Sequence, residues 1–206
     1  MISADKYNQI TSESAGAECI AISKKRSVEE IMHLYSFGHR SFGENYLQEL
    51  STKVFELKNL GIVWHYTGRI QSRKCQAIAN LVDWVHSINS LRQLELLSLH
   101  RHAGKRPLQC LLQVIPSGYK HDYALSFEAA CELPRQMPNL EVVGIMVMPA
   151  AFESDSDVAK IFASASEFAF ENWRNPVISM GMSADYKLAL QHGSNMLRLG
   201  RVFFSI

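Results

Sequence analysis

A lysine follows directly after a short apolar segment near the start of the chain. Residues 19–23 read CIAIS, and Lys24 and Lys25 come next. If this segment is a strand, side-chain alternation places Lys24 on the side of Ile20 and Ile22, and the next lysine on the opposite side. An amine beside apolar residues loses hydration, which disfavours its charged form, and the neutral amine is the nucleophile that forms a Schiff base with a carbonyl. Lys24 is therefore a candidate nucleophile, and a solvated lysine at a strand end is the alternative.

Two glycine-containing segments late in the chain are typical of an anion site. Gly181-Met182-Ser183 precedes a helical pattern, so that backbone N–H groups, a hydroxyl and the positive end of the helix dipole face the same point. The segment around Gly200 offers further backbone N–H groups. If these segments follow the last two strands of a (β/α)8 barrel, they occupy its usual phosphate site. A capped helix and a tight turn without a ligand are the alternative.

Other polar and sulfur-containing residues favour structural roles. His65 has Trp64 and Tyr66 as neighbours and no second ligand at metal spacing, so we expect a hydrogen-bonded interior residue. Met146 and Met148 are expected in the core or in a pocket wall. Four scattered cysteines without a CxxC pair favour buried, reduced thiols, three of them within apolar patterns: Cys19, Cys110 and Cys131.

The elements that must position these residues alternate along the chain. Eight short apolar segments are predicted strands, at residues 19–23, 39–45, 62–68, 84–88, 108–115, 140–149, 177–182 and 196–204. Helical spacing is predicted between them, at residues 27–38, 46–60, 72–81, from 90 onward, 126–136, 155–173 and 183–193, with Ser183 as the cap of the last. Alternating elements indicate a parallel sheet.

Eight such units favour an α/β fold of one domain over residues 1–206, a single (β/α)8 TIM-type barrel. Strands buried on both faces read as continuous apolar segments, and several of these do. A doubly wound open sheet is the competing architecture. No GxGxxG follows the first strand, which removes the best-known signature of that alternative without excluding it.

Composition excludes several classes of function. The formal net charge is +1 and no long run of lysine and arginine occurs, so we expect no nucleic-acid partner. The apolar segments are strand-sized, which disfavours a membrane span. The first 18 residues lack the pattern of a secretory signal, and the cysteine usage suits a reducing compartment. We therefore expect a cytoplasmic protein.

Five ordered blocks resemble the pyridoxal-phosphate homeostasis family (YggS/PROSC), whose fold is like the N-terminal barrel of alanine racemase. AISK at 21–24 is similar to the family's AVSK, and FGENYLQE at 42–49 to its FGENYVQE. WHYTGRIQSRK at 64–74 and MVMPAAFES at 146–154 resemble two further blocks. The last block, SMGMSADYKLALQHGSNMLRLGRVFF at 179–204, resembles SLGMSxDxxxAIxxGSTMVRIGTAIF.

The resemblance implies a pyridoxal 5′-phosphate (PLP) site. Lys24 would form the aldimine, and Asn45 would lie beside the cofactor. Ser183, Gly200 and Arg201 would hold the phosphate, and Arg198 would face the pyridine nitrogen. Together with Met148 as pocket wall, the expected cofactor-binding residues are Lys24, Asn45, Met148, Ser183, Arg198, Gly200 and Arg201.

The function that the resemblance implies is a non-enzymatic carrier of PLP, expected to be monomeric, with PLP-requiring apo-enzymes as recipients. An arginine does not keep the ring nitrogen protonated, so the cofactor would be a weak electron sink. A PLP-dependent racemase is an alternative. Alanine racemase takes its second base from an added domain of the partner subunit, and only Tyr46 and Lys120 are candidates here. A phosphate-binding barrel without PLP and a Schiff-base aldolase are further alternatives.

The chain also departs from the family pattern. Arg73 stands in place of Asn, and Lys120 is followed by His121 and not Ser. Arg201 replaces a small hydroxyl residue, and Ser205 replaces a glycine. The family's N-terminal helix is expected to be shortened, within residues 1–18. Extra arginines near a phosphate would either tighten binding or crowd the pocket.

Overall fold

The computed structural model describes residues 2–119, 121–150 and 153–204. Eight parallel strands form a closed barrel in the order β1–β2–β3–β4–β5–β7–β8–β9, with β9 paired back to β1 and β5 paired to β7. The barrel predicted from the sequence is confirmed. Its strands are β1 (Glu18–Ile22), β2 (Ser41–Glu44), β3 (Val63–Tyr66), β4 (Trp84–Ile88), β5 (Leu108–Val114), β7 (Leu140–Val147), β8 (Val177–Ser179) and β9 (Met196–Leu199).

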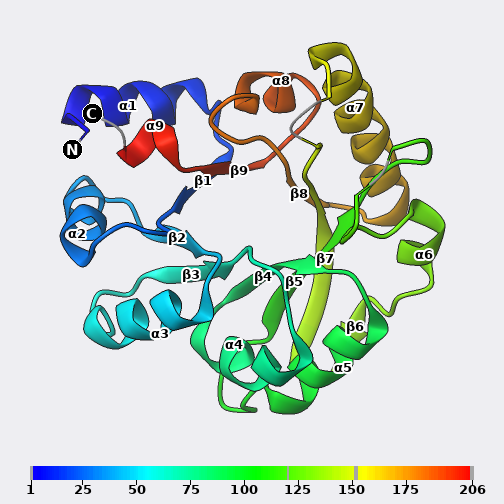
Figure 1. The fold of residues 1–206 in the computed structure, drawn as a ribbon, viewed down its shortest axis with the longest axis horizontal. Helices are drawn as coiled ribbons and strands as arrows, with labels where there is room; N and C mark the ends of the chain where they lie inside the picture. Colours follow the sequence, from blue (N-terminus) through cyan, green and yellow to red (C-terminus); the bar gives the residue numbers. More distant parts are fainter. Residues whose placement is uncertain (1, 120, 151–152, 205–206) are drawn as a thin grey trace.

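Helices surround the strands as an outer ring (Figure 1). They are α1 (Ala4–Glu13), α2 (Val28–Ser36), α3 (Leu47–Glu56), η1 (Ser72–Lys74), α4 (Cys75–Leu81), α5 (Leu91–His100), α6 (Phe127–Cys131), α7 (Asp155–Asn172), α8 (Tyr186–Gln191) and α9 (Arg201–Phe204). Ser27 caps α2 in the capping box that the sequence predicts, because its hydroxyl accepts from the Glu30 N–H while the Glu30 carboxylate accepts from the Ser27 N–H.

Two predicted elements are wrong in extent. The helix predicted over 126–136 ends at Cys131, because Pro134 disfavours helical geometry in the residue before it. Gln136–Met137 form instead a short strand, β6, antiparallel to β7. The last predicted strand, 196–204, ends at Leu199, and the chain turns at Gly200 into α9.

The N-terminal segment of residues 1–18 contains the helix α1. Ser3 caps it, and its buried Ile10 joins the core. Tyr7 of α1 packs against Phe203 of α9, with 5.9 Å between the ring centroids, so the first and last helices lie side by side (Figure 1).

The apolar residues form two separate clusters. The larger one fills the space between the outer faces of the strands and the helices, with Phe42, Ile78, Leu97 and Phe162 fully buried within it. The smaller one lies inside the barrel and consists of Ile20, Leu111, Met146 and Met196. Side chains on one strand therefore alternate between a helix-facing core and the interior, as expected for a closed barrel.

The cysteines do not all follow the prediction. All four are free thiols. Cys110 is buried as predicted, and Cys75, which lies outside the apolar patterns, is buried as well. Cys19 is only partly buried, and Cys131 is exposed at the end of α6. The prediction for Cys131 is wrong because the helix that would have buried it is shorter than the pattern indicates.

None of the helices in the described ranges has the length and apolarity to cross a membrane. Nor do three or more His, Cys, Asp or Glu side chains of those ranges gather in a geometry that would hold a metal ion.

Gly144 tests the closure of the barrel. It pairs with Val177 between β7 and β8, and a Cβ on this glycine would collide with the Val177 backbone. We expect Gly144→Ala to lower the free energy of unfolding by about 3 kcal/mol or more, because neither strand can move aside. Urea denaturation measures it. Gly104→Ala is the control, since its Cβ meets only the His102 side chain. Equal stability of the two variants would contradict this account of the β7–β8 contact.

Candidate functional site

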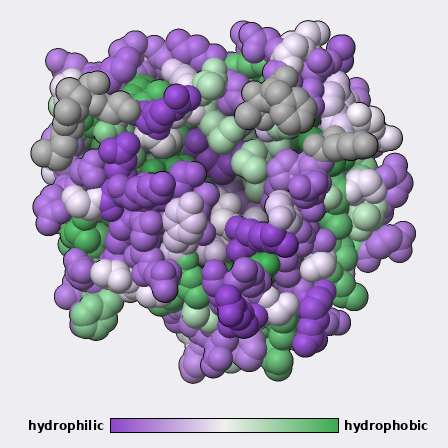
Figure 2. Space-filling view, in the orientation of Figure 1, coloured by the Kyte–Doolittle hydropathy of each residue, from purple (hydrophilic) through white to green (hydrophobic). Residues whose placement is uncertain are grey.

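A cavity of about 270 Å³ lies at the carboxyl ends of the barrel strands. Figure 2 shows a mostly hydrophilic face that is hollowed near its centre. All seven residues expected to bind the cofactor line this cavity, together with five that were not in that set. The lining residues are Ile22, Lys24, Asn45, Thr67, Met146, Met148, Met182, Ser183, Ala184, Arg198, Gly200 and Arg201.

Strand alternation accounts for the two lysines. Ile20 belongs to the interior cluster, Ile22 packs against it, and Lys24 lines the cavity above them. Lys25 is not among the lining residues. Its φ is +60°, and its N–H donates to Glu49 at 2.7 Å. The predicted directions of the two lysines are confirmed.

The predicted desolvation of Lys24 is not found. The residue is exposed, because the cavity is open at the barrel mouth and Lys24 forms only one of its walls. Its nucleophilic role therefore depends on where its amine is held and not on burial of that amine.

Arg198 is a buried cation in the cavity floor. One terminal nitrogen donates to the Ser179 carbonyl at 2.7 Å and to its hydroxyl at 2.9 Å, and the other donates to the Val147 carbonyl at 2.8 Å. Burial lowers the pKa of Arg198 to about 10, which leaves it charged at neutral pH. Among the described residues that line the cavity three are cationic and none is acidic. The cavity is therefore built for an anion.

A chain of buried polar groups runs from Arg198 through the barrel interior. The Ser179 hydroxyl lies 3.0 Å from Nδ1 of His86, and Nε2 of His86 lies 3.0 Å from Nδ1 of His65. Both histidines are completely buried. His65 is thus a hydrogen-bonded interior residue, as its sequence context predicts.

The polarity of this chain follows from its arginine end. A guanidinium only donates, so the Ser179 oxygen accepts from Arg198. The hydroxyl of Ser179 then donates its single proton to His86. His86 then carries its proton on Nε2 and donates to Nδ1 of His65. The remaining proton, on Nε2 of His65, has no hydrogen-bond partner and faces the Glu18 carboxylate at 3.8 Å. Every proton in the chain therefore points away from the cavity.

Both histidines are neutral at physiological pH. Burial lowers the pKa of His65 to about 3, so the 3.8 Å approach to Glu18 is not an ion pair at neutral pH. Burial, the neighbouring His65 and the charge of Arg198 lower the pKa of His86 in the same direction. Of the described residues in the barrel interior, Arg198 at the cavity floor is thus the one that carries a positive charge.

Ser183 does not cap a helix, contrary to the prediction. The helix α8 begins at Tyr186, with Asp185 in the cap position. Asp185 accepts the Met182 N–H at 2.6 Å, so this N–H is not available to an anion. The preceding Gly181 has a φ of +95°, and a Cβ on this residue would lie 2.7 Å from the Ala189 Cβ, so only glycine fits here. The part of this loop that lines the cavity therefore includes Ser183 and Ala184 and is not a helix end.

The loop after β9 lies beside Ser183. Gly200 and Arg201 line the cavity, and the Val202 N–H donates to the Ser183 hydroxyl at 3.4 Å. The segments around Ser183 and Gly200 thus lie next to each other, as predicted for a phosphate site. Arg201, which departs from the family pattern, contributes a third positive charge to this wall.

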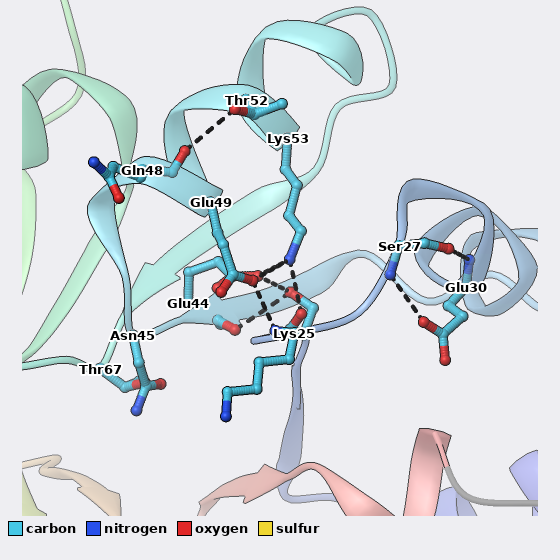
Figure 3. A network of polar contacts seen from close by, with 12 residues as sticks. Lys25, Ser27, Glu30, Glu44, Asn45, Gln48, Glu49, Thr52, Lys53 and Thr67 are labelled. Carbon is cyan, nitrogen blue, oxygen red and sulfur yellow. Dashed lines mark hydrogen bonds and ion pairs between the residues drawn. The ribbon is translucent and has the colours of Figure 1, made fainter.

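Asn45 and Thr67 form the wall opposite. The Thr67 hydroxyl donates to the Asn45 side-chain oxygen at 2.8 Å (Figure 3). Because that oxygen is occupied, the Asn45 amide group presents its NH₂ as a donor. Thr67 was not among the predicted residues. Side chains two positions apart along β3 and its continuation point to the same side, so the interior position of His65 would have placed Thr67 inside the barrel.

Other candidate residues lie away from the cavity. Tyr46 is half exposed and is not a lining residue, so its predicted place at the barrel mouth is wrong. Arg73 is exposed in η1, and His121 accepts from the Tyr123 N–H; neither lines the cavity. Lys120 and Ser205 lie outside the described residues.

The pKa of His65 predicts how stability depends on pH. An unfolded histidine binds a proton with a pKa of about 6.5, and the folded value is about 3. The unfolded state therefore holds more protons between these values, and stability falls as the pH falls. We expect His65→Asn to reduce this slope by about 1.4 kcal/mol per pH unit over roughly pH 4–5.5. Urea titrations at several pH values measure it, with the exposed His102→Asn as control. A slope as steep as that of the wild type would contradict the buried, neutral state of His65.

Comparison with known proteins bears on this site. Residues 4–206 match the family model described as "Alanine racemase, N-terminal domain". The "Pyridoxal phosphate homeostasis protein" of Pseudomonas aeruginosa is 36% identical over 90% of this chain and 82% of its own length. The protein with the same name from Escherichia coli strain K12 is 33% identical over 90% and 83%.

Solved structures agree with these matches. The structure of PipY from Synechococcus elongatus PCC7942 "with PLP bound" has a TM-score of 0.87 and 30% identity, covering 98% of this chain and 99% of that one. Alanine racemase from Corynebacterium glutamicum shares the fold, with a TM-score of 0.69, 16% identity and coverage of 98% and 60%. Because the family model and relatives above 30% identity extend over almost the whole barrel, this chain belongs to the pyridoxal phosphate homeostasis protein family, which is built on the alanine racemase N-terminal domain.

Proposed function

We propose that this protein binds PLP in the cavity at the barrel mouth, with Lys24 joined to it as a Schiff base. The observation that carries the proposal is the charge of the cavity: Lys24, Arg198 and Arg201 line it, and no acidic residue among those described does. A phosphorylated aldehyde satisfies both features, because its phosphate neutralises the cations and its carbonyl reacts with the amine.

The lining residues fit the two ends of such a ligand. Ser183, Gly200 and Arg201 offer a hydroxyl, a backbone N–H and a guanidinium on the phosphate side. Lys24 follows β1 and the Asn45 amide donor follows β2, and both line the same cavity. Between them Met148 and Ile22 supply apolar contacts for a ring, and Arg198 approaches from the floor.

Arg198 favours storage and delivery over catalysis. Bound PLP supplies an aldehyde and a ring that withdraws electrons, most strongly when its nitrogen is protonated. Arg198 donates only and is fixed by three hydrogen bonds to Ser179 and Val147, so it does not stabilise a protonated ring nitrogen. We infer a carrier that holds PLP reversibly, with PLP-requiring apo-enzymes as its recipients. The PLP-bound relative PipY and the names of the curated relatives support this.

Trapping the Schiff base tests the proposal. We expect protein incubated with PLP and then reduced with borohydride to carry one pyridoxyl group, on Lys24. Lys24→Ala should lose the label and the visible absorbance change. Lys25→Ala is the matched control and should keep both, because Lys25 does not line the cavity. Peptide mapping decides: a label on Lys25 with Lys24 unmodified refutes the assignment, and no label at all refutes the proposed ligand chemistry.

A racemase activity is the competing function, and the cavity disfavours it. Racemisation needs a base on each face of the substrate carbon. Lys24 is the one amine among the described lining residues, and the two arginines cannot accept a proton. General acid–base help is worth about 10²–10⁴-fold, so we expect L-alanine to racemise no faster than with free PLP at equal concentration. Chiral analysis measures both rates. A rate orders of magnitude above the free cofactor, lost in Lys120→Ala or Tyr46→Phe, would make the protein an enzyme.

A further inference from the structure

A buried ammonium group lies directly behind the loop that carries Lys24. Lys53 on α3 donates to the Ser23 carbonyl at 2.8 Å, to Glu44 at 2.7 Å and to Glu49 at 3.0 Å (Figure 3). The Ser23 hydroxyl donates to the same Glu44 oxygen at 2.7 Å. We call these four residues, Ser23, Glu44, Glu49 and Lys53, the Lys53 cluster.

Three members of the cluster, Ser23, Glu44 and Lys53, are buried, and Glu49 is partly exposed. Only 5% of Lys53 is exposed and none of Glu44, whose second carboxylate oxygen has no hydrogen-bond partner. Replacing such a pair by apolar residues is often neutral or stabilising, so stability alone does not explain why the charges are buried here. A role in positioning would explain it.

The cluster joins the strand ends from which two cavity residues project. Ser23 immediately precedes Lys24, and Glu44 immediately precedes Asn45. Lys53 therefore connects the carboxyl ends of β1 and β2 at the residues next to the cavity wall. A residue that fixes these two ends fixes the starting points of both side chains.

The cluster also controls the peptide that follows Lys24. Glu49, held by Lys53, accepts the Lys25 N–H at 2.7 Å. Lys25 is in the left-handed region, with a φ of +60°, which is unfavourable for a residue other than glycine. Ser23 accepts the Arg26 N–H on the same carbonyl that Lys53 binds. This turn keeps Lys24 on the side that strand alternation gives it and directs Lys25 away from the cavity.

We propose that Lys53 is a positioning residue that holds the β1–α2 loop in the turn that presents Lys24, and not Lys25, to the cavity. Lys53 itself is not among the cavity-lining residues, so its effect is transmitted through Ser23, Glu44 and Glu49. The inference rests on the proposed function for the identity of the ligand, although the loop geometry does not depend on it.

Lys53→Met tests the role, because it keeps the chain length and removes the ammonium. After PLP and borohydride treatment, we expect the label to be shared between Lys24 and Lys25, where the wild type carries it on Lys24. The apparent dissociation constant for PLP should rise about tenfold to a hundredfold, the range expected for a lost charged hydrogen bond.

Arg101→Met is the matched control. Arg101 is equally buried and donates to the Ala79, Val82 and Arg106 carbonyls, at the opposite end of the barrel. Its loss should lower stability without moving the label. If a folded Lys53→Met keeps the label on Lys24 at unchanged affinity, the positioning role is refuted.

A double variant covers the case in which Lys53→Met fails to fold. Lys53→Met with Glu44→Gln removes both buried charges, so that only the partly exposed Glu49 carboxylate loses its cation. It still lacks the bond to the Ser23 carbonyl. We expect the same shared label, and a label confined to Lys24 in this folded variant would overturn the proposal.

Amide exchange of the protein without PLP separates the two proposals. We expect the Lys25 and Arg26 amides to exchange at least tenfold faster in the Lys53 variants than in Arg101→Met, since their acceptors are no longer held. If the wild type takes up no PLP, the proposed function is wrong, and the comparison of exchange rates still tests the role of Lys53. Equal exchange rates would refute the Lys53 role whatever the ligand.

Discussion

The site depends on one geometric constraint: in a closed parallel barrel every second side chain of each strand must lie inside. The interior is filled by apolar groups around Ile20 and Met146 and by the buried chain of His65, His86 and Ser179. The next interior position on each strand has no layer above it, so its side chain borders a cavity. Lys24, Asn45, Thr67 and Arg198 all reach the cavity by this count of two.

The cost of a buried cation gives the cavity its chemistry. Arg198 obtains hydrogen bonds from the barrel but no carboxylate, and the chain beneath it consists of neutral histidines whose protons all point away. A negative ligand above Arg198 therefore replaces the counter-charge that the protein omits. Lys53, which does not line the cavity, is the contrasting case, because Glu44 and Glu49 neutralise this buried cation.

Much of this arrangement could be predicted from the sequence, because it follows from periodicity. Alternating strand and helix patterns give the barrel, and the count from Ile20 to Ile22 gives the direction of Lys24. The resemblance added Asn45, Arg198 and the late loops. The features that the sequence does not predict depend on contacts between residues far apart in the chain. Asp185, not Ser183, is in the cap position of α8, and the hydrogen-bond partner of His65 lies 21 residues away. Lys53 carries no local sign that its ammonium is buried between two strand ends.

The most direct test of the central claim is a crystal structure of the protein grown with PLP. We expect continuous electron density from the Lys24 side chain to the ring. The phosphate should lie beside Ser183, Gly200 and Arg201, and the Arg198 guanidinium should lie at the ring nitrogen. The Lys53 contacts should be unchanged. Density joined to another lysine, or a phosphate bound away from the cavity that these residues line, would contradict the central claim.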